Sequence, residues 1–211
     1  MEQFKTIMQD AQAEIEEKKS RFIANVYYIE KTEEAEEHLK HIRKKYFNAR
    51  HNCFAYRILE ENGVKEKQSD DGEPSGTAGA PMLNILQKNN LYNVLVVVTR
   101  YFGGTLLGTG GLVRAYSDAT IKSLENAKVI IQTKGYLINV VIEYKNLEKF
   151  KYYCRMHGII IVNTVYENNI ICTIEISKNE KENLLGKEQK EITILGNTVI
   201  REKYIRINIE E

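Results

Sequence analysis

The stretch from Ser69 to Asp118 constrains the fold of this chain more than any other part of its sequence. It contains eight of the 13 glycines and both prolines, placed around the apolar run VLVVVTRYF. Glycine adopts positive φ angles without strain and lets two backbone segments approach closely, and proline is favoured in turns. We therefore expect this stretch to form tight turns around a buried central strand.

Composition narrows the class of protein. A chain of 211 residues suits one large domain or two ordinary ones, and 43% hydrophobic with 28% charged residues is typical of a globular protein. The three cysteines show no CxxC spacing, so the sequence predicts neither a disulfide framework nor a zinc site. Because the net charge is only +1, binding of nucleic acid would need a local basic patch.

The distribution of apolar residues along the sequence predicts the cellular location of the protein. No apolar run is long enough to cross a bilayer, and the first residues lack the apolar core of a signal peptide. We therefore expect a cytoplasmic protein with no membrane association.

The segment before Ser69 mixes helical and strand patterns. Residues 5–19 fit either a helical face or a strand, and periodicity alone leaves this choice open. Strands are predicted over 20–30 and 51–59, with a helix capped by Thr32 between them.

The following elements surround the glycine-rich turns. Residues 61–76 are predicted to be a polar loop, and a short helix is predicted to begin at Pro81. The apolar run 93–99 is typical of a strand covered on both faces. Helical spacing over 112–127 predicts the next helix, followed by a short strand over 129–133.

The composition of the sequence changes near Lys134–Gly135, because glycine is sparse after this point. We therefore expect two domains, 1–134 and 135–211. Strand, helix, two strands, helix and strand follow in the second domain, which is the order of a ferredoxin-like βαββαβ domain. The predicted elements are strand 136–144, helix 147–157, strands 159–166 and 170–176, a helix capped by Ser177 and Glu180 through 190, and strand 198–209.

The strand over 51–59 is the first candidate for a binding surface. His51 and Arg57 lie on one of its faces, roughly 20 Å apart at the rise of a strand. Each side chain could contact an extended anion, whereas the alternative is an intramolecular ion pair of Arg57 at an edge of the sheet.

The glycine-rich segment 103–111, GGTLLGTGG, lies between a buried strand and a helix. Backbone N–H groups at such a place can receive a phosphate, which makes Gly103, Gly104 and Gly110 candidates. The segment is neither a Walker A loop nor a dinucleotide fingerprint. The alternative interpretation is a tight connection in which side chains would clash.

The acidic segment Asp70, Asp71 and Glu73, with Ser75 and Thr77, is the candidate for catalysis or metal binding. Its carboxylates could bind magnesium or orient a base. However, Asp-Gly and Glu-Pro are also ordinary turn sequences, and neither hydroxyl has a partner that the sequence identifies. We therefore assign no catalytic residue, no metal and no cofactor.

Arginines and aromatic residues flank the glycines. Guanidinium groups beside exposed rings bind single-stranded nucleic acid by phosphate contact and base stacking, and Arg100, Tyr101 and Arg114 fit this description. In the alternative interpretation the rings are core and the arginines pair with the acidic segment. The complete set of candidate RNA or phosphate contacts is His51, Tyr56, Arg57, Arg100, Tyr101, Gly103, Gly104, Gly110 and Arg114.

Four long blocks of sequence carry a resemblance to a known family. They are KKSRFIA (18–24), ARHNCFAYR (49–57), SDDGEPSGTAGAPML (69–83) and VVVTRYFGGTLLGTGGLVRAYSDA (96–119). With these blocks the chain resembles the IMPACT family, known in bacteria as the YigZ family. The second domain resembles the small carboxy-terminal module of the bacterial members by its size and element order.

The resemblance implies an α+β fold. The first domain would be similar to a small-subunit ribosomal protein and to the fourth domain of elongation factor G, with residues 5–19 as a strand. The ferredoxin-like second domain would be similar to the fifth domain of that factor. Eukaryotic relatives resemble regulators of translation that bind a protein partner, and bacterial members suggest binding of nucleic acid or the ribosome.

Three functions follow as hypotheses. The preferred one is a non-catalytic protein that binds RNA or the ribosome and takes part in translation control, with Arg57, Arg100 and Arg114 on phosphates. The second is an enzyme acting on a phosphorylated or nucleotide-like small molecule, with His51 and the acidic segment as its acid–base or metal groups. The third is a protein–protein adaptor in which the glycine-rich stretch serves only the fold.

Overall fold

The computed structural model describes residues 2–60, 62–186 and 192–207. Helices and strands are mixed along these ranges, so the protein belongs to the α+β class. Within them, no helix combines the length and the apolar character needed to cross a membrane.

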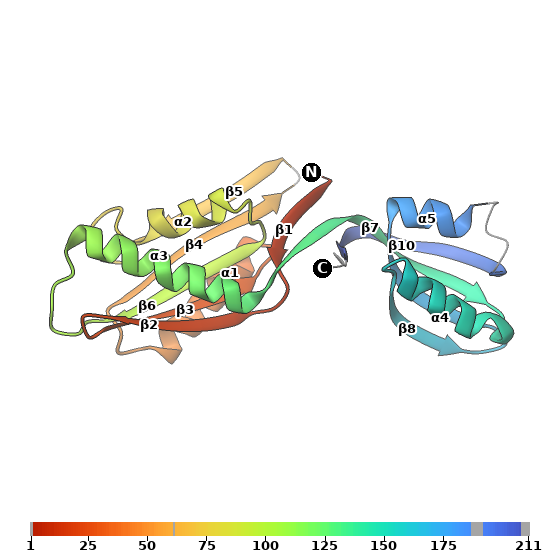
Figure 1. Ribbon diagram of the computed structural model, residues 1–211, viewed down its shortest axis with the longest axis horizontal. Helices are drawn as coiled ribbons and strands as arrows, with labels where there is room; N and C mark the ends of the chain where they lie inside the picture. Colours follow the sequence, from red (N-terminus) through yellow and green to blue (C-terminus); the bar gives the residue numbers. More distant parts are fainter. Residues whose placement is uncertain (1, 61, 187–191, 208–211) are drawn as a thin grey trace. The chain divides into compact units, whose positions relative to one another are not determined.

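The chain divides into two compact units (Figure 1). The first comprises residues 4–130, and the second comprises residues 131–211 together with residues 1–3. The division falls within strand β7 (Val129–Ile142), and the boundary expected from the sequence, Lys134–Gly135, lies in the same strand.

A five-stranded antiparallel sheet forms the centre of the first unit. Its strand order is β2-β3-β6-β4-β5, so β6 lies in the middle and β2 and β5 are the edges. The strands are β2 (Ala11–Glu17), β3 (Ser20–Tyr28), β6 (Val94–Tyr101), β4 (His51–Glu60) and β5 (Gly63–Ser69).

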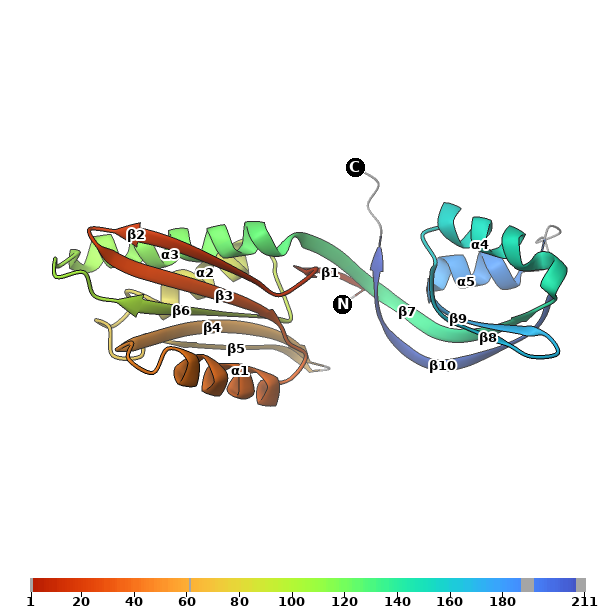
Figure 2. The ribbon, with the colours of Figure 1, turned by 90° about the horizontal axis from the view of Figure 1, so that it is seen from below.

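Helices cover both faces of this sheet (Figure 2). On one face, Val94, Val96 and Val98 of β6 pack in the core formed with α2 (Gly79–Lys88) and α3 (Gly108–Ala127). On the other face, Leu95 and Val97 pack against α1 (Thr32–Lys45). The prediction of a strand buried on both faces is confirmed, because an apolar run without alternation offers a hydrophobic side chain to each core.

Two stretches of the first unit differ from the interpretation of the sequence. Residues 5–19 contain parts of two strands, β1 (Gln3–Ile7) and β2, and no helix, so the single strand that the family resemblance implied is divided in two. The predicted polar loop 61–76 contains strand β5, although residue 61 lies outside the described residues. Because β5 is an edge strand that is exposed almost throughout, it shows no apolar alternation in the sequence.

The observed helices also begin at residues other than those predicted from the sequence. α1 begins at Thr32 with Lys31 as its N-cap, and α2 begins at Gly79, before Pro81. α3 begins at Gly108, before the predicted start at Leu112. The second half of the glycine-rich segment is therefore the first turn of a helix, which glycine's low helical propensity concealed in the sequence.

The second unit has the ferredoxin-like arrangement. Its strands lie in the order β10-β7-β9-β8, all antiparallel, and β1 also pairs with β7. A hydrophobic core that includes Ile138, Phe150 and Leu184 lies between this sheet and its two helices. Besides β7, the elements are α4 (Leu147–Met156), β8 (Ile160–Tyr166), β9 (Ile170–Ser177), α5 (Lys178–Leu185) and β10 (Ile194–Ile207).

Some boundaries of the second unit are corrected. The strands predicted over 129–133 and 136–144 form the single strand β7. α5 ends at Leu185, and residues 187–190 of the predicted helix lie outside the described residues. β10 begins before residue 198, and residues 208–209 of the predicted strand are likewise outside the described part of the chain.

Candidate functional site

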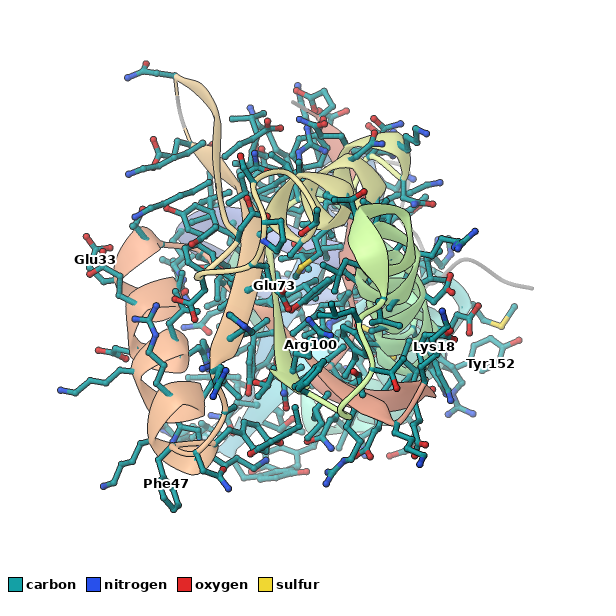
Figure 3. All side chains as sticks on the ribbon, turned by 90° about the vertical axis from the view of Figure 1, so that its left-hand side faces the viewer. Lys18, Glu33, Phe47, Glu73, Arg100 and Tyr152 are labelled. Atoms are coloured by element: carbon teal, nitrogen blue, oxygen red, sulfur yellow. The ribbon has the colours of Figure 1, made fainter. Side chains whose placement is uncertain are left out.

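Four connections meet at one end of the first sheet. In the strand register Arg21 pairs with Tyr101, His51 pairs with Arg100, and Phe54 pairs with Ser69. The connections that adjoin these pairs therefore lie together, and we call them the loop end (Figure 3). The loop end comprises residues 18–19, 46–50, 70–78 and 102–110.

A buried ion pair lies beneath the loop end. Arg100 Nη1 is 2.8 Å from Glu73 Oε1, and the side chains are 7% and 3% exposed. Tyr116 donates a hydrogen bond to the same Glu73 oxygen at 2.9 Å, and Arg100 Nη2 donates to Ser20 Oγ at 3.3 Å. Figure 3 shows Glu73 and Arg100 in the middle of this end. The expected phosphate contact of Arg100 is corrected, because its guanidinium group is enclosed and pairs with the acidic segment.

Cys53 and Tyr116 extend this buried network. Cys53 Sγ lies 2.9 Å from the Asp70 carbonyl oxygen and 3.3 Å from Tyr116 Oη. Burial raises the pKa of the Cys53 thiol to about 12 and also raises the pKa of Tyr116. Both groups are therefore protonated at neutral pH, and Cys53 is not a nucleophilic thiolate.

Asp70 stabilises the start of α2. Its carboxylate accepts hydrogen bonds from the backbone N–H groups of Gly76, Ala78 and Gly79, at 2.8, 3.0 and 2.8 Å. Burial alone would raise the pKa of Asp70, but the three backbone donors outweigh it and hold the pKa below its ordinary value. The carboxylate thus serves as a helix cap.

The rest of the acidic segment is held to the sheet in a similar way. Asp71 Oδ2 accepts a hydrogen bond from the Asn52 backbone N–H at 2.7 Å, and its carbonyl oxygen is 2.9 Å from His51 Nδ1. Thr77 is buried and donates to the Pro74 carbonyl, whereas Ser75 is exposed. Among the described residues no three His, Cys, Asp or Glu side chains are grouped as metal ligands.

Two candidates from strand β4 are buried. Arg57 Nε is 2.7 Å from Glu66 Oε1, and its Nη1 donates to the carbonyl oxygens of Leu86 and Leu91. Tyr56 is 2% exposed in the core of the opposite face. The roles expected for these residues, on phosphate and on a base, are corrected: the ion pair of Arg57 is intramolecular, although β4 lies inside the sheet.

The glycines divide into two groups. A Cβ atom on Gly103 would overlap the backbone of Lys19 and Ser20, so this glycine permits a close contact between two connections. In contrast, Gly104 has φ +90° with open space around it, and Gly110 is exposed with nothing within 4 Å of its Cβ position. The tight-packing interpretation therefore holds for Gly103, while Gly104 and Gly110 remain accessible to a ligand.

Exposed apolar and basic side chains occur on several connections of the loop end, and Figure 3 shows Phe47 and Lys18 on opposite sides of it. Phe47, Phe102 and Leu106 are 82%, 53% and 83% exposed. Tyr101 is half-buried, with its hydroxyl donating to Asn48 Oδ1 at 2.8 Å. The exposed basic residues are Lys18, Lys19, Arg50 and Arg114, and among the described residues none of their side chains has a hydrogen-bond or ion-pair partner.

The candidate residues predicted from the sequence thus lie in different places in the structure. The structure places Gly103, Gly104 and Gly110 in the loop end, His51 and Tyr101 at the strand ends that adjoin it, and Arg114 one turn further along α3. Sequence reasoning missed Phe47 and Leu106, and it did not assign Lys18, Lys19 or Arg50 to a site. A signal was present, since the basic residues lie within the sequence blocks 18–24 and 49–57 that carry the family resemblance.

Comparison with known proteins supports that resemblance. Residues 18–124 match the Impact N-terminal domain, and residues 140–187 match a domain of unknown function, DUF1949. A solved structure described as that of a hypothetical protein is similar over 100% of this chain and 99% of its own, with 28% identity and a TM-score of 0.61.

Similar sequences carry the same family name. IMPACT family member YvyE of Bacillus subtilis is 37% identical over 189 residues, which cover 89% of this chain and 86% of that protein. An IMPACT family member of Haemophilus influenzae is 37% identical over 170 residues, covering 80% of this chain and 82% of the relative. The chain therefore belongs to the IMPACT family.

Proposed function

We propose that this protein binds single-stranded RNA, or an exposed RNA segment of the ribosome, through the loop end, and that it does so without catalysis. The role is control of translation in the cytoplasm. The resemblance of the eukaryotic relatives to translational regulators supports this role. A protein partner in the same process is compatible with this role.

The proposal is carried by one observation: exposed rings and unpaired cations occur together at the loop end. Phe47 and Phe102 offer rings on which bases can stack, and such stacking contributes about 1–3 kcal/mol per base. Lys18, Arg50 and Arg114 offer positive charge for the phosphates that connect those bases. A chain of net charge +1 can bind RNA in this way because the charge is local.

The glycines allow an RNA backbone to approach the protein closely. The first turn of α3 has glycine at positions 108, 110 and 111 and contains no acidic residue. An RNA backbone can therefore approach the N-terminus of α3, where the helix dipole favours negative charge.

An enzymatic function has less support. The acidic carboxylates expected to act as a base or to hold a metal instead bind backbone N–H groups, Arg100 and Tyr116. His51 Nδ1 is directed at the Asp71 carbonyl oxygen. No group with a free acid–base role is thus left in the segment for which that hypothesis was made.

Fluorescence anisotropy with a labelled single-stranded RNA, measured over a range of salt concentrations, tests the proposal. Each phosphate contact adds about 0.7 to the slope of log K against log salt for a single strand. Arg114→Ala should weaken binding and reduce that slope by about 0.7.

The matched control is Lys88→Ala. Lys88 is exposed at the C-terminal end of α2, away from the loop end, and its loss changes the net charge by the same amount. It should leave affinity and slope unchanged. Binding that does not depend on salt, or that responds equally to the two substitutions, would contradict the proposal.

A further inference from the structure

The second unit contains a cleft that the proposed function does not use. Its volume is about 830 Å³, within the range of small-molecule sites, and all of its lining residues belong to this unit. The cleft lies where the end of α4, the start of α5, the first part of β7 and the end of β10 meet.

Basic side chains line the cleft. They are Lys134, Arg155, Lys178 and Arg206, against the two carboxylates of Glu2 and Glu180. Glu180 Oε2 is held by His157 Nδ1 at 2.9 Å, so this carboxylate has a partner in the wall. The cleft therefore has a positive balance in a chain that is almost neutral as a whole.

Within the described part of the chain, three of the cations in the cleft have side chains without a partner. Lys134, Arg155 and Lys178 have no hydrogen-bond or ion-pair partner for their side chains among the described residues. In contrast, Lys145, Lys151 and Lys203 each make an ion pair within the unit, at 2.7, 2.9 and 2.6 Å. Like charges that converge on a hollow and outnumber its carboxylates repel one another, and an anion in the hollow reduces that repulsion.

The backbone adds to this field. Ser177 is the N-cap of α5, and Lys178 and Asn179, which begin the helix, line the cleft. Backbone N–H groups of a first helical turn carry partial positive charge. Helix start and cations therefore favour the same kind of ligand.

The remaining lining indicates the rest of the ligand. Met156, Ile159 and Ile205 provide apolar surface in the same cleft. A neighbouring hollow of about 500 Å³ shares Lys134 and Lys178 with it, so these two lysines can reach a ligand in either hollow. A single carboxylate would leave most of the cations unpaired, whereas a phosphate offers three oxygens and up to two negative charges.

We propose that this cleft binds a small phosphate-bearing molecule of about nucleotide size. The phosphate contacts Lys134, Lys178 and Arg155, and an uncharged ring lies against Met156 and Ile159. This site lies on different elements from the loop end, so the second unit binds a small molecule independently of the RNA that the first unit is proposed to bind.

Isothermal titration calorimetry on the full chain tests the proposal with inorganic phosphate, adenosine 5′-monophosphate and adenosine. The monophosphate should bind saturably, phosphate more weakly, and adenosine not at all. The double variant Lys134→Ala/Lys178→Ala should weaken binding of the monophosphate at least tenfold.

Control variants locate the effect. Lys145→Ala/Lys151→Ala removes the same charge from the same unit outside the cleft and should leave the affinity unchanged. Amide NMR shifts on adding the monophosphate should concentrate at 155–158 and 177–180. Absence of saturable binding, equal loss in both double variants, or shifts confined to the first unit would overturn the proposal.

The same double variants separate this proposal from the proposed function. RNA binding by the loop end should be unaffected by Lys134→Ala/Lys178→Ala, since neither residue belongs to it. Loss of monophosphate binding with retained RNA binding supports the cleft, whereas loss of RNA binding in this variant contradicts the independence of the two sites.

Discussion

At the scale of single residues, buried charge explains why so few candidates reach the surface. Glu73 accepts hydrogen bonds from Arg100 and Tyr116 in a place that is almost completely buried. Transfer of an isolated charge into such a place is costly, so each partner makes the other tolerable. Arg100 is thereby a structural residue that connects the acidic segment to strand β6.

Replacement of Glu73 by Gln should therefore destabilise the protein. The change leaves Arg100 buried without its counter-ion, and breaking such a pair costs about 3–5 kcal/mol. Unfolding in urea, followed by circular dichroism, measures the loss. Glu14→Gln is the control, because its pair with Arg21 is exposed and contributes no more than about 1 kcal/mol. Equal losses for the two variants would contradict a buried pair.

The carboxylate of Asp70 gives a dependence on pH. Its pKa is lower in the folded protein than in the unfolded chain, so its stabilisation is fully present above the unfolded pKa. It is lost as the pH falls through the lower, folded pKa. Asp70→Ala should cost about 0.5–2 kcal/mol at pH 7, as for other capping residues, and progressively less in acid. A difference from the wild type that stays constant down to pH 2 would contradict this assignment.

At the scale of elements, the loop end depends on a contact between two connections. The turn before β3 and the segment after β6 approach so closely that only glycine fits at position 103, and its N–H donates to Ser20 Oγ at 3.1 Å. Since β3 and β6 are paired strands, this contact fixes where Phe102 and Leu106 emerge.

Gly103→Ala should consequently lower stability, because a Cβ atom there collides with backbone that cannot move freely; overpacking of this kind costs about 1–3 kcal/mol or more. Gly110→Ala is a matched control in the first turn of α3. Its Cβ meets open space, and alanine in a helix is about 0.5–1 kcal/mol more favourable than glycine. In thermal unfolding, Gly103→Ala should lower the melting temperature and Gly110→Ala should raise it. A shift in the same direction for both variants would disprove the close contact.

At the scale of the whole molecule, two units carry two different kinds of surface. The first has exposed rings and cations on its loop end, suited to an extended polyanion, and the second has a cleft with cations, suited to a small one. Strand β7 belongs to both units, since it begins at Val129 and continues through Ile142. Each surface can therefore be altered by substitutions that leave the other unit's core intact.

The sequence by itself determined the features that depend on neighbours along the chain. The apolar run 93–99 showed a strand buried on both faces, and Ser177 with Glu180 marked the start of α5, where the Ser177 hydroxyl accepts the Glu180 N–H. The order of elements in the second unit and membership of the IMPACT family could also be predicted. The buried strand, the start of α5 and the order of elements depend on propensity, capping and periodicity, which act over a few residues. Family membership depends on contiguous blocks of sequence.

Only the tertiary structure decided which charges are available. Arg57, Arg100 and Arg114 look alike in the sequence, yet two are enclosed and one is exposed. The partner of Arg100, Glu73, lies 27 residues away, and the cations of the cleft come from four different elements. Burial and electrostatic partners depend on chain segments that meet only after folding, so no local pattern could reveal them.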